Sequence, residues 1–313
     1  VTGVQTCALP IYIRAKDSTQ RIMLYVIIAL LPATVFGIIN FGPRALAVVV
    51  VSIASCLVSE YLYNKIAHKK QTVGDLSCVV TGLLLGLNLS HTVPFFIPII
   101  GGAFAIVVVK MVFGGLGQNF MNPALGARCF LLLAFTGPMT SFTFDGVSSA
   151  TPLAVIKGGE LYSDTMAMFT GRIAGTIGET SVIALLIGAI FLILMGVIDL
   201  RIPGTYILTF VVFIVLFGGH LTSGDLGQFV VQEVCGGGLI LGAFFMATDY
   251  VTSPITPKGK IIYGIICGCL LGIFRMFGAS AEGCSYSIIF ANMLVPLIER
   301  FTIPKPFGKG GEK

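Results

Sequence analysis

Long apolar runs separated by short polar stretches fill most of the chain. Each run is close to the roughly 20 residues that an α-helix needs to cross about 30 Å of hydrocarbon. We therefore predict an all-α polytopic membrane protein with about ten transmembrane helices. The predicted spans are residues 22–40, 45–63, 76–91, 94–113, 121–136, 181–198, 204–220, 229–248, 260–278 and 284–300.

Two predicted spans, 76–91 and 121–136, are short and are bordered by glycine, asparagine and proline. Interrupted helices are tolerated at membrane depth where their backbone packs on protein or lines a site. We therefore expect short, broken helices at these two places.

The two halves of the chain resemble each other weakly. Residues 82–86 read GLLLG and residues 238–242 read GLILG, and a proline-containing turn follows each motif. Because five spans is an odd number, the second half would be inverted relative to the first. Inverted repeats with broken helices place a binding site near the membrane midplane. The alternative is that these paired small residues only allow close helix packing.

Composition supports a membrane protein. Of the 313 residues, 56% are hydrophobic and 11% are charged, and the mean hydropathy is +0.97. Soluble domains carry about 25% charged residues, so these charges are too few to cover a core of this size. An ordinary soluble enzyme and a nucleic-acid binder are excluded, and the expected environment is a lipid membrane. In a membrane protein, the net charge of +5 reflects which side of the membrane the basic loops lie on.

Lysine and arginine are distributed unevenly between the predicted loops, and cytoplasmic loops carry the excess of these residues. With ten spans both termini lie on one side, and only Arg44, Lys157 and Arg172 fall on the other side. We therefore predict that both termini are cytoplasmic and that the long loop 137–180 is extracytoplasmic. The basic residues on the predicted cytoplasmic side are Arg14, Lys16, Arg21, Lys65, Lys69, Lys70, Arg201, Lys258, Lys260, Lys305, Lys309 and Lys313.

The chain divides into five segments on this basis. Residues 1–11 match the one-frame translation of a common sequencing adapter, so we expect this segment to be an artefact. The other segments are a first five-helix half (12–136), the extracytoplasmic loop (137–180), a second five-helix half (181–304) and a basic cytoplasmic tail (305–313).

Three charged residues, Lys110, Arg128 and Glu233, fall inside or at the margin of predicted spans. A charge at bilayer depth is costly and indicates a functional site by default. For Lys110 we favour a side chain that snorkels to the cytoplasmic interface. For Arg128 a functional role and a misplaced span boundary stay equally open. Glu233 could attract a cation or face a wet loop.

The cysteines and histidines form no catalytic or metal-binding set. We therefore expect no catalytic residues and no metal ligands in this chain. No cysteine pair has C-x-x-C spacing, so the cysteines are interpreted as small buried hydrophobes. The alternative is an iron–sulfur ligand shared with a neighbouring subunit, at Cys78, Cys129 or Cys235. The residues concerned are Cys56, Cys78, Cys129, Cys235, Cys267, Cys269, Cys284, His68, His91 and His220.

The motif with the clearest chemistry is Asp145–Leu153, which reads DGVSSATPL within the predicted extracytoplasmic loop. The small residues before Thr151 leave its hydroxyl sterically open. An open hydroxyl is accessible to an enzyme that esterifies a group to threonine. On composition alone, the segment is typical of a polar turn that begins at Asp145–Gly146.

This motif resembles the flavinylation motif D-x-x-S-G-A-T of the RnfD/NqrB family, in which the threonine carries covalent FMN. Ser149 stands where the family usually has glycine. The resemblance continues in DLSCVVTG (75–82), QNFMNPA (118–124) and FMATDYVTSP (245–254), and it covers nearly all of the chain after residue 11. The length of the chain favours RnfD over NqrB, which has a longer N-terminal extension.

The resemblance implies a membrane subunit of the Rnf complex, which moves electrons between ferredoxin and NAD and couples them to Na⁺ or H⁺ translocation. The attachment motif would comprise Asp145, Ser148, Ser149, Ala150 and Thr151, with FMN joined to Thr151 through a phosphoester by a separate flavin transferase. The other Rnf subunits would be its partners. A second, non-covalent flavin, riboflavin, would lie within the helices. The candidate residues for it are Asn119, Asn122, Thr248 and Asp249.

The chain contains no dinucleotide fingerprint and no P-loop. We therefore expect NAD to bind another subunit, and this chain to relay electrons within a redox enzyme without being catalytic alone. Two alternatives stay open. One is an NqrB-like component of a Na⁺-translocating NADH:quinone reductase. The other is a flavin-free channel or secondary transporter with inverted repeats, which would have no reason to contain DGVSSATPL.

Overall fold

The computed structural model describes residues 18–144, 147–148, 150–218, 225–278 and 282–303. The predicted artefact at residues 1–11 and the predicted tail at 305–313 lie outside this part of the chain. Within it, the regular secondary structure is helical apart from one hairpin of two short strands. In this hairpin Thr143 pairs with Ser148 and Phe144 with Val147. The all-α class is therefore confirmed.

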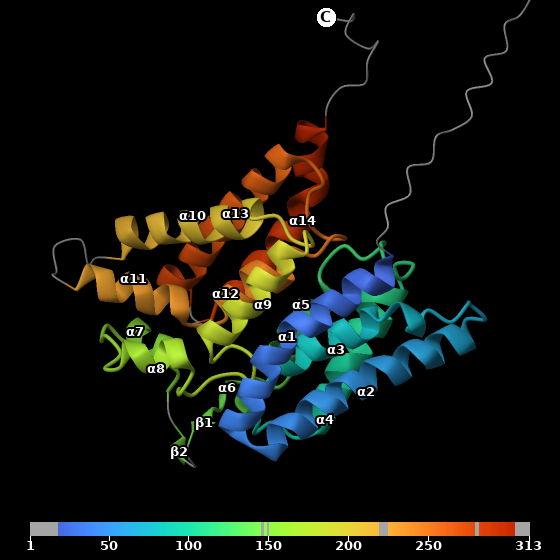
Figure 1. The fold of residues 1–313 in the computed structure, drawn as a ribbon, viewed down its shortest axis with the longest axis horizontal. Coiled ribbons are helices and arrows are strands. Elements are labelled where there is room, and N and C mark those ends of the chain that lie inside the picture. Colours follow the sequence, from blue (N-terminus) through green and yellow to red (C-terminus); the bar gives the residue numbers. More distant parts are fainter. Residues whose placement is uncertain (1–17, 145–146, 149, 219–224, 279–281, 304–313) are drawn as a thin grey trace, which may run out of the picture.

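The helices follow the predicted spans closely (Figure 1). Each of the ten predicted ranges overlaps a helix or a run of two or three consecutive helical elements. The first half contains α1 (Thr19–Phe41), α2 (Pro43–Ile66), η1 (Val73–Asp75), α3 (Ser77–Leu87), α4 (Phe96–Ala103), the π-helix η2 (Phe104–Met111) and α5 (Pro123–Ala134). The loop contains α6 (Thr136–Thr140), β1 (Thr143–Phe144), β2 (Val147–Ser148), α7 (Pro152–Lys157) and α8 (Thr165–Thr170). The second half contains α9 (Val182–Leu194), α10 (Arg201–Phe217), α11 (Leu226–Cys235), α12 (Leu239–Leu241), the π-helix η3 (Gly242–Met246), α13 (Pro257–Phe277) and α14 (Cys284–Thr302).

Length and hydropathy separate these helices into two groups. Among the described residues, three helices are long and apolar enough to cross a membrane: α1, α2 and α13. The pair α11 and α12–η3 also qualifies as a unit, but it is bent by 58°. The shorter apolar helices are α3, α4–η2, α5, α9 and α10, and α3 and α5 fall in the two ranges where short helices were expected. α14 has 19 residues but is not among the helices that pass the hydropathy test. The number of ten spans stays a prediction.

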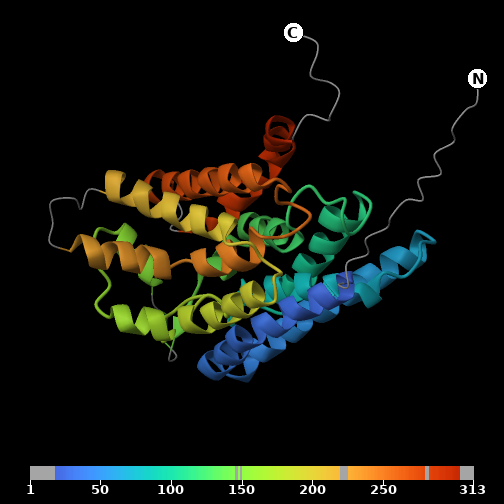
Figure 2. The same cartoon turned by 45° about the horizontal axis from the view of Figure 1, so that its top comes forward.

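The two halves lie beside each other and meet along a central interface (Figure 2). There α1 packs against α9, and α5 packs against α14. The outward surface is strongly apolar: Ile39 is 76% exposed, Leu208 65% and Phe301 79%. Large apolar side chains on the surface combined with buried charges inside are what a lipid environment favours.

The connecting segments gather at two opposite ends of the helical assembly. At the loop end, Asn40 at the end of α1 donates to the Gly171 carbonyl (3.0 Å), and Lys157 of α7 donates to the Gly278 carbonyl after α13. Figure 1 shows α6, α7, α8 and the hairpin gathered there. We call the opposite end the turn end. There the segment between η3 and α13 lies against the end of α14, and Thr256 donates to Thr302 (2.7 Å).

The two glycine motifs are used differently. A Cβ on Gly82 would lie 2.6 Å from the Ile53 Cα, so Gly82 lets α3 pack backbone to backbone on α2. In the second motif, Gly238 adopts the left-handed conformation (φ +68°) that begins α12. Gly242 packs against the Cys284 side chain. Close packing thus accounts for most of the pattern, and the inverted repeat stays a prediction.

Candidate functional site

Thr151 lies at the loop end as the N-cap residue of α7. Its Oγ1 accepts a hydrogen bond from the Ala154 amide (3.3 Å), and Pro152 occupies the first helical position. Threonine at the cap and proline directly after it are both favoured at helix starts. The sequence therefore fixes the backbone at the predicted attachment residue, while the hydroxyl stays only half-buried.

The rest of the predicted attachment motif is described only in part. Ala150 is exposed, as an open approach to Thr151 requires. Ser148 belongs to β2. Asp145 and Ser149 lie outside the described residues.

Thr151 lines a small, mostly apolar pocket whose wall carries a few polar side chains. The pocket is closed on one side by residues that end the long loop, and Gly178 there donates its amide to the Leu87 carbonyl (2.8 Å). Thr180 lines the pocket and is 1% exposed, and its hydroxyl has no hydrogen-bond partner in the described part of the chain. Buried hydroxyls normally have a hydrogen-bond partner, so Thr180 can bond a further polar group after a local rearrangement. The lining residues are Thr151, Pro152, Leu153, Ile173, Ala174, Gly175, Glu179, Thr180, Gly236, Gly237 and Glu282.

A buried arginine forms one wall of this region. Arg128 of α5 is 4% exposed and donates to Asn88 Oδ1 (2.6 Å) and Glu179 Oε1 (2.7 Å), and also to a Glu282 carboxylate oxygen. Burial raises the pKa of Glu179, and the Arg128 guanidinium opposes part of that rise. Arg128 therefore has specific ionic partners inside the protein, whereas the position of the span boundary stays a prediction.

A second buried arginine lies beside the first. Arg275 of α13 pairs with Glu233 (2.9 Å) and donates to the carbonyls of Gly236 (2.8 Å) and Gly237 (3.3 Å). It thereby satisfies carbonyls that the end of α11 leaves free at the bend. Glu233 is 3% exposed, so it neither faces a wet loop nor offers a free carboxylate to a cation, as the sequence had suggested.

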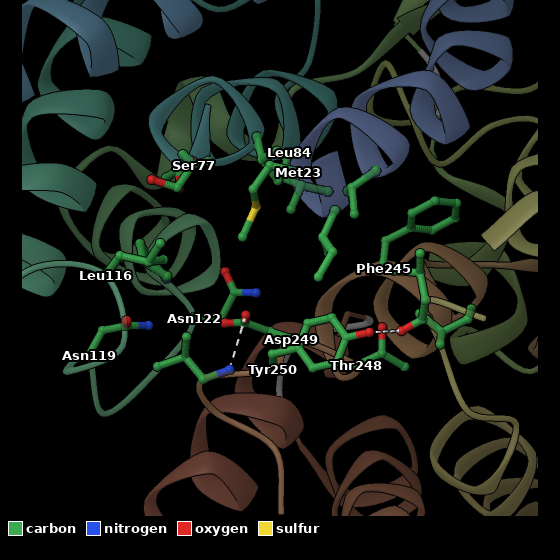
Figure 3. Close-up of a pocket in the computed structure, with 18 of the residues that line it drawn as sticks. Met23, Ser77, Leu84, Leu116, Asn119, Asn122, Phe245, Thr248, Asp249 and Tyr250 are labelled. Atoms are coloured by element: carbon green, nitrogen blue, oxygen red, sulfur yellow. Dashed lines mark hydrogen bonds between the residues drawn. The ribbon is translucent and has the colours of Figure 1, made fainter. Parts of the chain in front are cut away.

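The four residues predicted to hold a second flavin come together at the turn end. Asn119, Asn122, Thr248 and Asp249 line one pocket, although the two pairs are more than 120 residues apart (Figure 3). The cavity itself measures about 80 Å³ and opens to the surface. Ligand sites commonly combine apolar walls with a few polar groups. The pocket therefore has the composition of a ligand site.

The sequence explains how these polar groups are positioned. Asn122 caps α5: its Oδ1 accepts from the Ala124 (3.0 Å) and Leu125 (3.4 Å) amides. Its Nδ2 donates to the Met246 carbonyl (3.3 Å), which joins the two halves. Asn119 donates to the Met121 carbonyl (3.1 Å). These contacts hold the Asn-Pro segment rigidly against η3.

The Thr-Asp segment forms the opposite wall. Thr248 donates to the Phe244 carbonyl (2.6 Å), and Asp249 accepts from the Val251 amide (3.4 Å) and the Thr252 hydroxyl (3.2 Å). Burial raises the pKa of Asp249. Its carboxyl can therefore hold a proton and donate to a ligand more readily than an exposed aspartate.

Lys110 also lines this pocket, and its predicted snorkelling is wrong. Lys110 is 2% exposed, and its Nζ lies 2.7 Å from Glu60 Oε2 and 2.6 Å from Ser77 Oγ. Glu60 is fully buried and also accepts from Thr72 (2.6 Å). The lysine stays inside because a carboxylate neutralises it there.

Sequence reasoning missed four charged residues that complete these networks: Glu60, Glu179, Arg275 and Glu282. Glu60 and Arg275 lie within predicted spans 45–63 and 260–278, and that signal could have identified them. The interpretation of the cysteines as small buried residues is confirmed for six of the seven that the structure describes. None of these seven forms a disulfide. Among the described residues, no group of three or more metal-ligating side chains occurs.

This architecture defines a helical membrane protein with a pocket at each of two opposite ends, and polar side chains stand on the wall of each. The chain belongs to the NQR2, RnfD, RnfE family, whose pattern matches residues 7–308. It is 48% identical to the D subunit of the Na⁺-translocating ferredoxin:NAD⁺ oxidoreductase complex of Acetobacterium woodii, over 95% of this chain and 93% of the relative. Identity is 40% with the D subunit of the proton-translocating ferredoxin:NAD⁺ oxidoreductase complex of Clostridium ljungdahlii, over 95% and 94%. It is 35% with the D subunit of the ion-translocating oxidoreductase complex of Methanosarcina acetivorans, over 97% of each chain.

Proposed function

We propose that this chain is the flavin-bearing membrane subunit of an ion-translocating ferredoxin:NAD⁺ oxidoreductase, and that it relays electrons through FMN bound to Thr151. The relatives from such ion-translocating complexes align over nearly their whole length and support this assignment. The single observation that carries the flavin proposal is Thr151 itself. It is a half-buried helix cap beside an exposed alanine, on a pocket with an unpartnered buried hydroxyl.

The residues at the loop end would hold such a group in place. When bound, FMN supplies one- and two-electron redox chemistry, and the protein supplies position and electrostatics. The cap geometry of Thr151 fixes where the phosphoester begins, and Pro152 removes one backbone freedom directly after it. The polar wall near Glu179 and Thr180 can orient hydrogen-bonding groups.

The test is in-gel fluorescence of the denatured chain under ultraviolet light, because a covalent flavin survives denaturation. Thr151→Ala abolishes the fluorescent band while the protein stays in the membrane. Thr170→Ala is the matched control, since Thr170 is an exposed threonine in the same loop. A wild-type chain without fluorescence, expressed with a flavin transferase, would instead favour a flavin-free transporter.

The second proposal is that the turn-end pocket binds riboflavin without a covalent bond. Its support is the convergence of Asn119, Asn122, Thr248 and Asp249 on one cavity with apolar walls. Acid extraction of the purified protein releases this flavin and leaves the covalent one. Thr248→Val lowers the extractable flavin, whereas Thr170→Ala leaves it unchanged. Equal yields from both variants would refute the assignment.

The third proposal concerns orientation: the loop end lies outside the cytoplasmic membrane, and both termini lie inside. The distribution of lysine and arginine supports it, and so does the clear division of the elements into two ends. In a variant without native cysteines, Ser163→Cys reacts with an impermeant thiol reagent in intact cells. Lys258→Cys, exposed at the turn end, reacts only after the membrane is breached. The reverse pattern would overturn the proposed orientation.

A further inference from the structure

A buried amide side chain lies behind the turn-end pocket. Asn292 of α14 is 2% exposed, and α14 packs against α5, α13 and η3. Asn292 is not among the described residues that line the pocket. An asparagine amide offers two donors and one acceptor oxygen, and a buried polar group without a partner is costly. The partners of Asn292 therefore show which segments it holds together.

Three segments meet on this amide. In the orientation that gives each neighbour a complementary group, Asn292 Oδ1 accepts from the Asn122 backbone amide (3.2 Å). Its Nδ2 donates to the Thr252 carbonyl (3.1 Å) and to the Tyr263 hydroxyl (2.6 Å). Thr252 is 3% exposed and Tyr263 is fully buried, so bulk water does not compete for these bonds. One side chain thus joins the start of α5, the segment after η3, and α13.

Two of these bonds lead to opposite walls of the pocket. Asn292 holds the backbone of Asn122, whose own side chain caps α5 and donates to the Met246 carbonyl. On the other wall, the Thr252 hydroxyl donates to Asp249 Oδ2 (3.2 Å). Asn122 and Asp249 both line the pocket (Figure 3). Because the two walls come from different halves of the chain, their spacing depends on contacts of this kind.

We propose that Asn292 is a positioning residue that holds the two walls of the turn-end pocket at one spacing and thereby sets the affinity of the pocket for its ligand. This inference rests on the proposed binding of riboflavin there. Groups that bind a ligand are effective only when the residues behind them fix their positions. Asn292→Leu keeps a similar side-chain volume but leaves the Asn122 amide and the Thr252 carbonyl without this partner.

The first test is a titration of the purified protein with riboflavin in detergent, after loosely held flavin has been washed out. Binding is followed by the quenching of riboflavin fluorescence. Asn292→Leu raises the Kd for riboflavin by about tenfold or more, because two buried bonds to the walls are lost. Tyr263→Phe raises it less, since the bonds from Asn292 to Asn122 and Thr252 remain. An unchanged Kd in Asn292→Leu refutes the inference.

Ser287→Ala is the matched control for a general loss of stability. Ser287 is a fully buried polar residue of the same helix, and its hydroxyl bonds the Tyr206 hydroxyl (2.7 Å) and the Cys284 carbonyl (2.8 Å). These residues are not among those that line the turn-end pocket. Ser287→Ala therefore lowers the unfolding temperature but leaves the Kd for riboflavin unchanged. An equal loss of affinity in Ser287→Ala and Asn292→Leu would overturn the positioning role.

The second test needs no variant that must fold. Hydrogen exchange of the washed wild type, resolved by peptide fragmentation, reports on the Asn122 backbone amide. This amide exchanges as slowly as those inside α5, because Asn292 accepts from it, and fast exchange refutes the network. A wild type that binds no riboflavin contradicts the proposed function of the pocket. A wild type that binds riboflavin, together with an unchanged Kd in Asn292→Leu, contradicts only this inference.

Discussion

Removal of Lys110 tests whether the buried charges are held as pairs. Lys110 and Glu60 are 2% and 0% exposed, and their charged atoms are 2.7 Å apart. Lys110→Met would leave the Glu60 carboxylate buried with Thr72 as its remaining described polar partner. Breaking a buried pair in this way costs about 3–5 kcal/mol.

The magnitude translates into a measurable shift. At about 2–4 °C per kcal/mol, the value for chains of roughly 150–250 residues, the unfolding midpoint falls by roughly 6–20 °C. The assay is thermal unfolding in detergent with a thiol-reactive fluorescent dye. Six of the seven described cysteines are buried, so they react as the chain unfolds.

A double variant separates the loss of the ion pair from other causes of lower stability. Lys110→Met combined with Glu60→Gln removes both charges, and the amide carbonyl introduced at position 60 can still accept from Thr72. Replacing a whole buried pair is often neutral or stabilising, so the double variant unfolds near the wild-type midpoint. If Lys110→Met alone unfolds within the error of the wild type, or the double variant is no better than it, the pairing argument is wrong.

Three further outcomes can be measured with the same preparations. Gly82→Ala places a Cβ 2.6 Å from the Ile53 Cα and destabilises by about 1–3 kcal/mol, whereas Gly204→Ala, with open space around it, changes stability by no more than about 1 kcal/mol. Asn122→Ala removes the cap of α5 and its bond to the second half, costs about 1 kcal/mol, and lowers the extractable flavin. Asp249→Asn lowers the extractable flavin but leaves the covalent fluorescent band unchanged; loss of both would show that the two sites are not independent.

The helical framework could be predicted from the sequence because apolar runs report burial in lipid directly. The predicted ranges fall on helices even where the helices are short, as at 76–91, where α3 ends at Leu87 and Asn88 caps it. The bend in 229–248 could not be predicted. It depends on Gly237 and Gly238, whose left-handed conformations (φ +63° and +68°) become visible only in the folded chain.

The candidate sites, like the fold, could be predicted from the sequence only in part. Family resemblance pointed to Asn119, Asn122, Thr248 and Asp249, and the fold brings them to one pocket. Pairings between distant charges were not predictable from one sequence. Lys110 was expected to snorkel because nothing along the chain indicates that Glu60, 50 residues away, reaches it. The Arg128 cluster was missed for the same reason, since its carboxylates lie 51 and 154 residues away.

The covalent flavin on Thr151 is the central claim, and peptide mass measurement tests it most directly. Trypsin releases residues 129–157 as one peptide, because no lysine or arginine interrupts it before Lys157. Co-expressed with a flavin transferase, this peptide gains the mass of FMN less one water, and fragmentation places the added mass on Thr151. An unmodified peptide, or an added mass on another hydroxyl such as Ser148 or Thr143, would contradict the account.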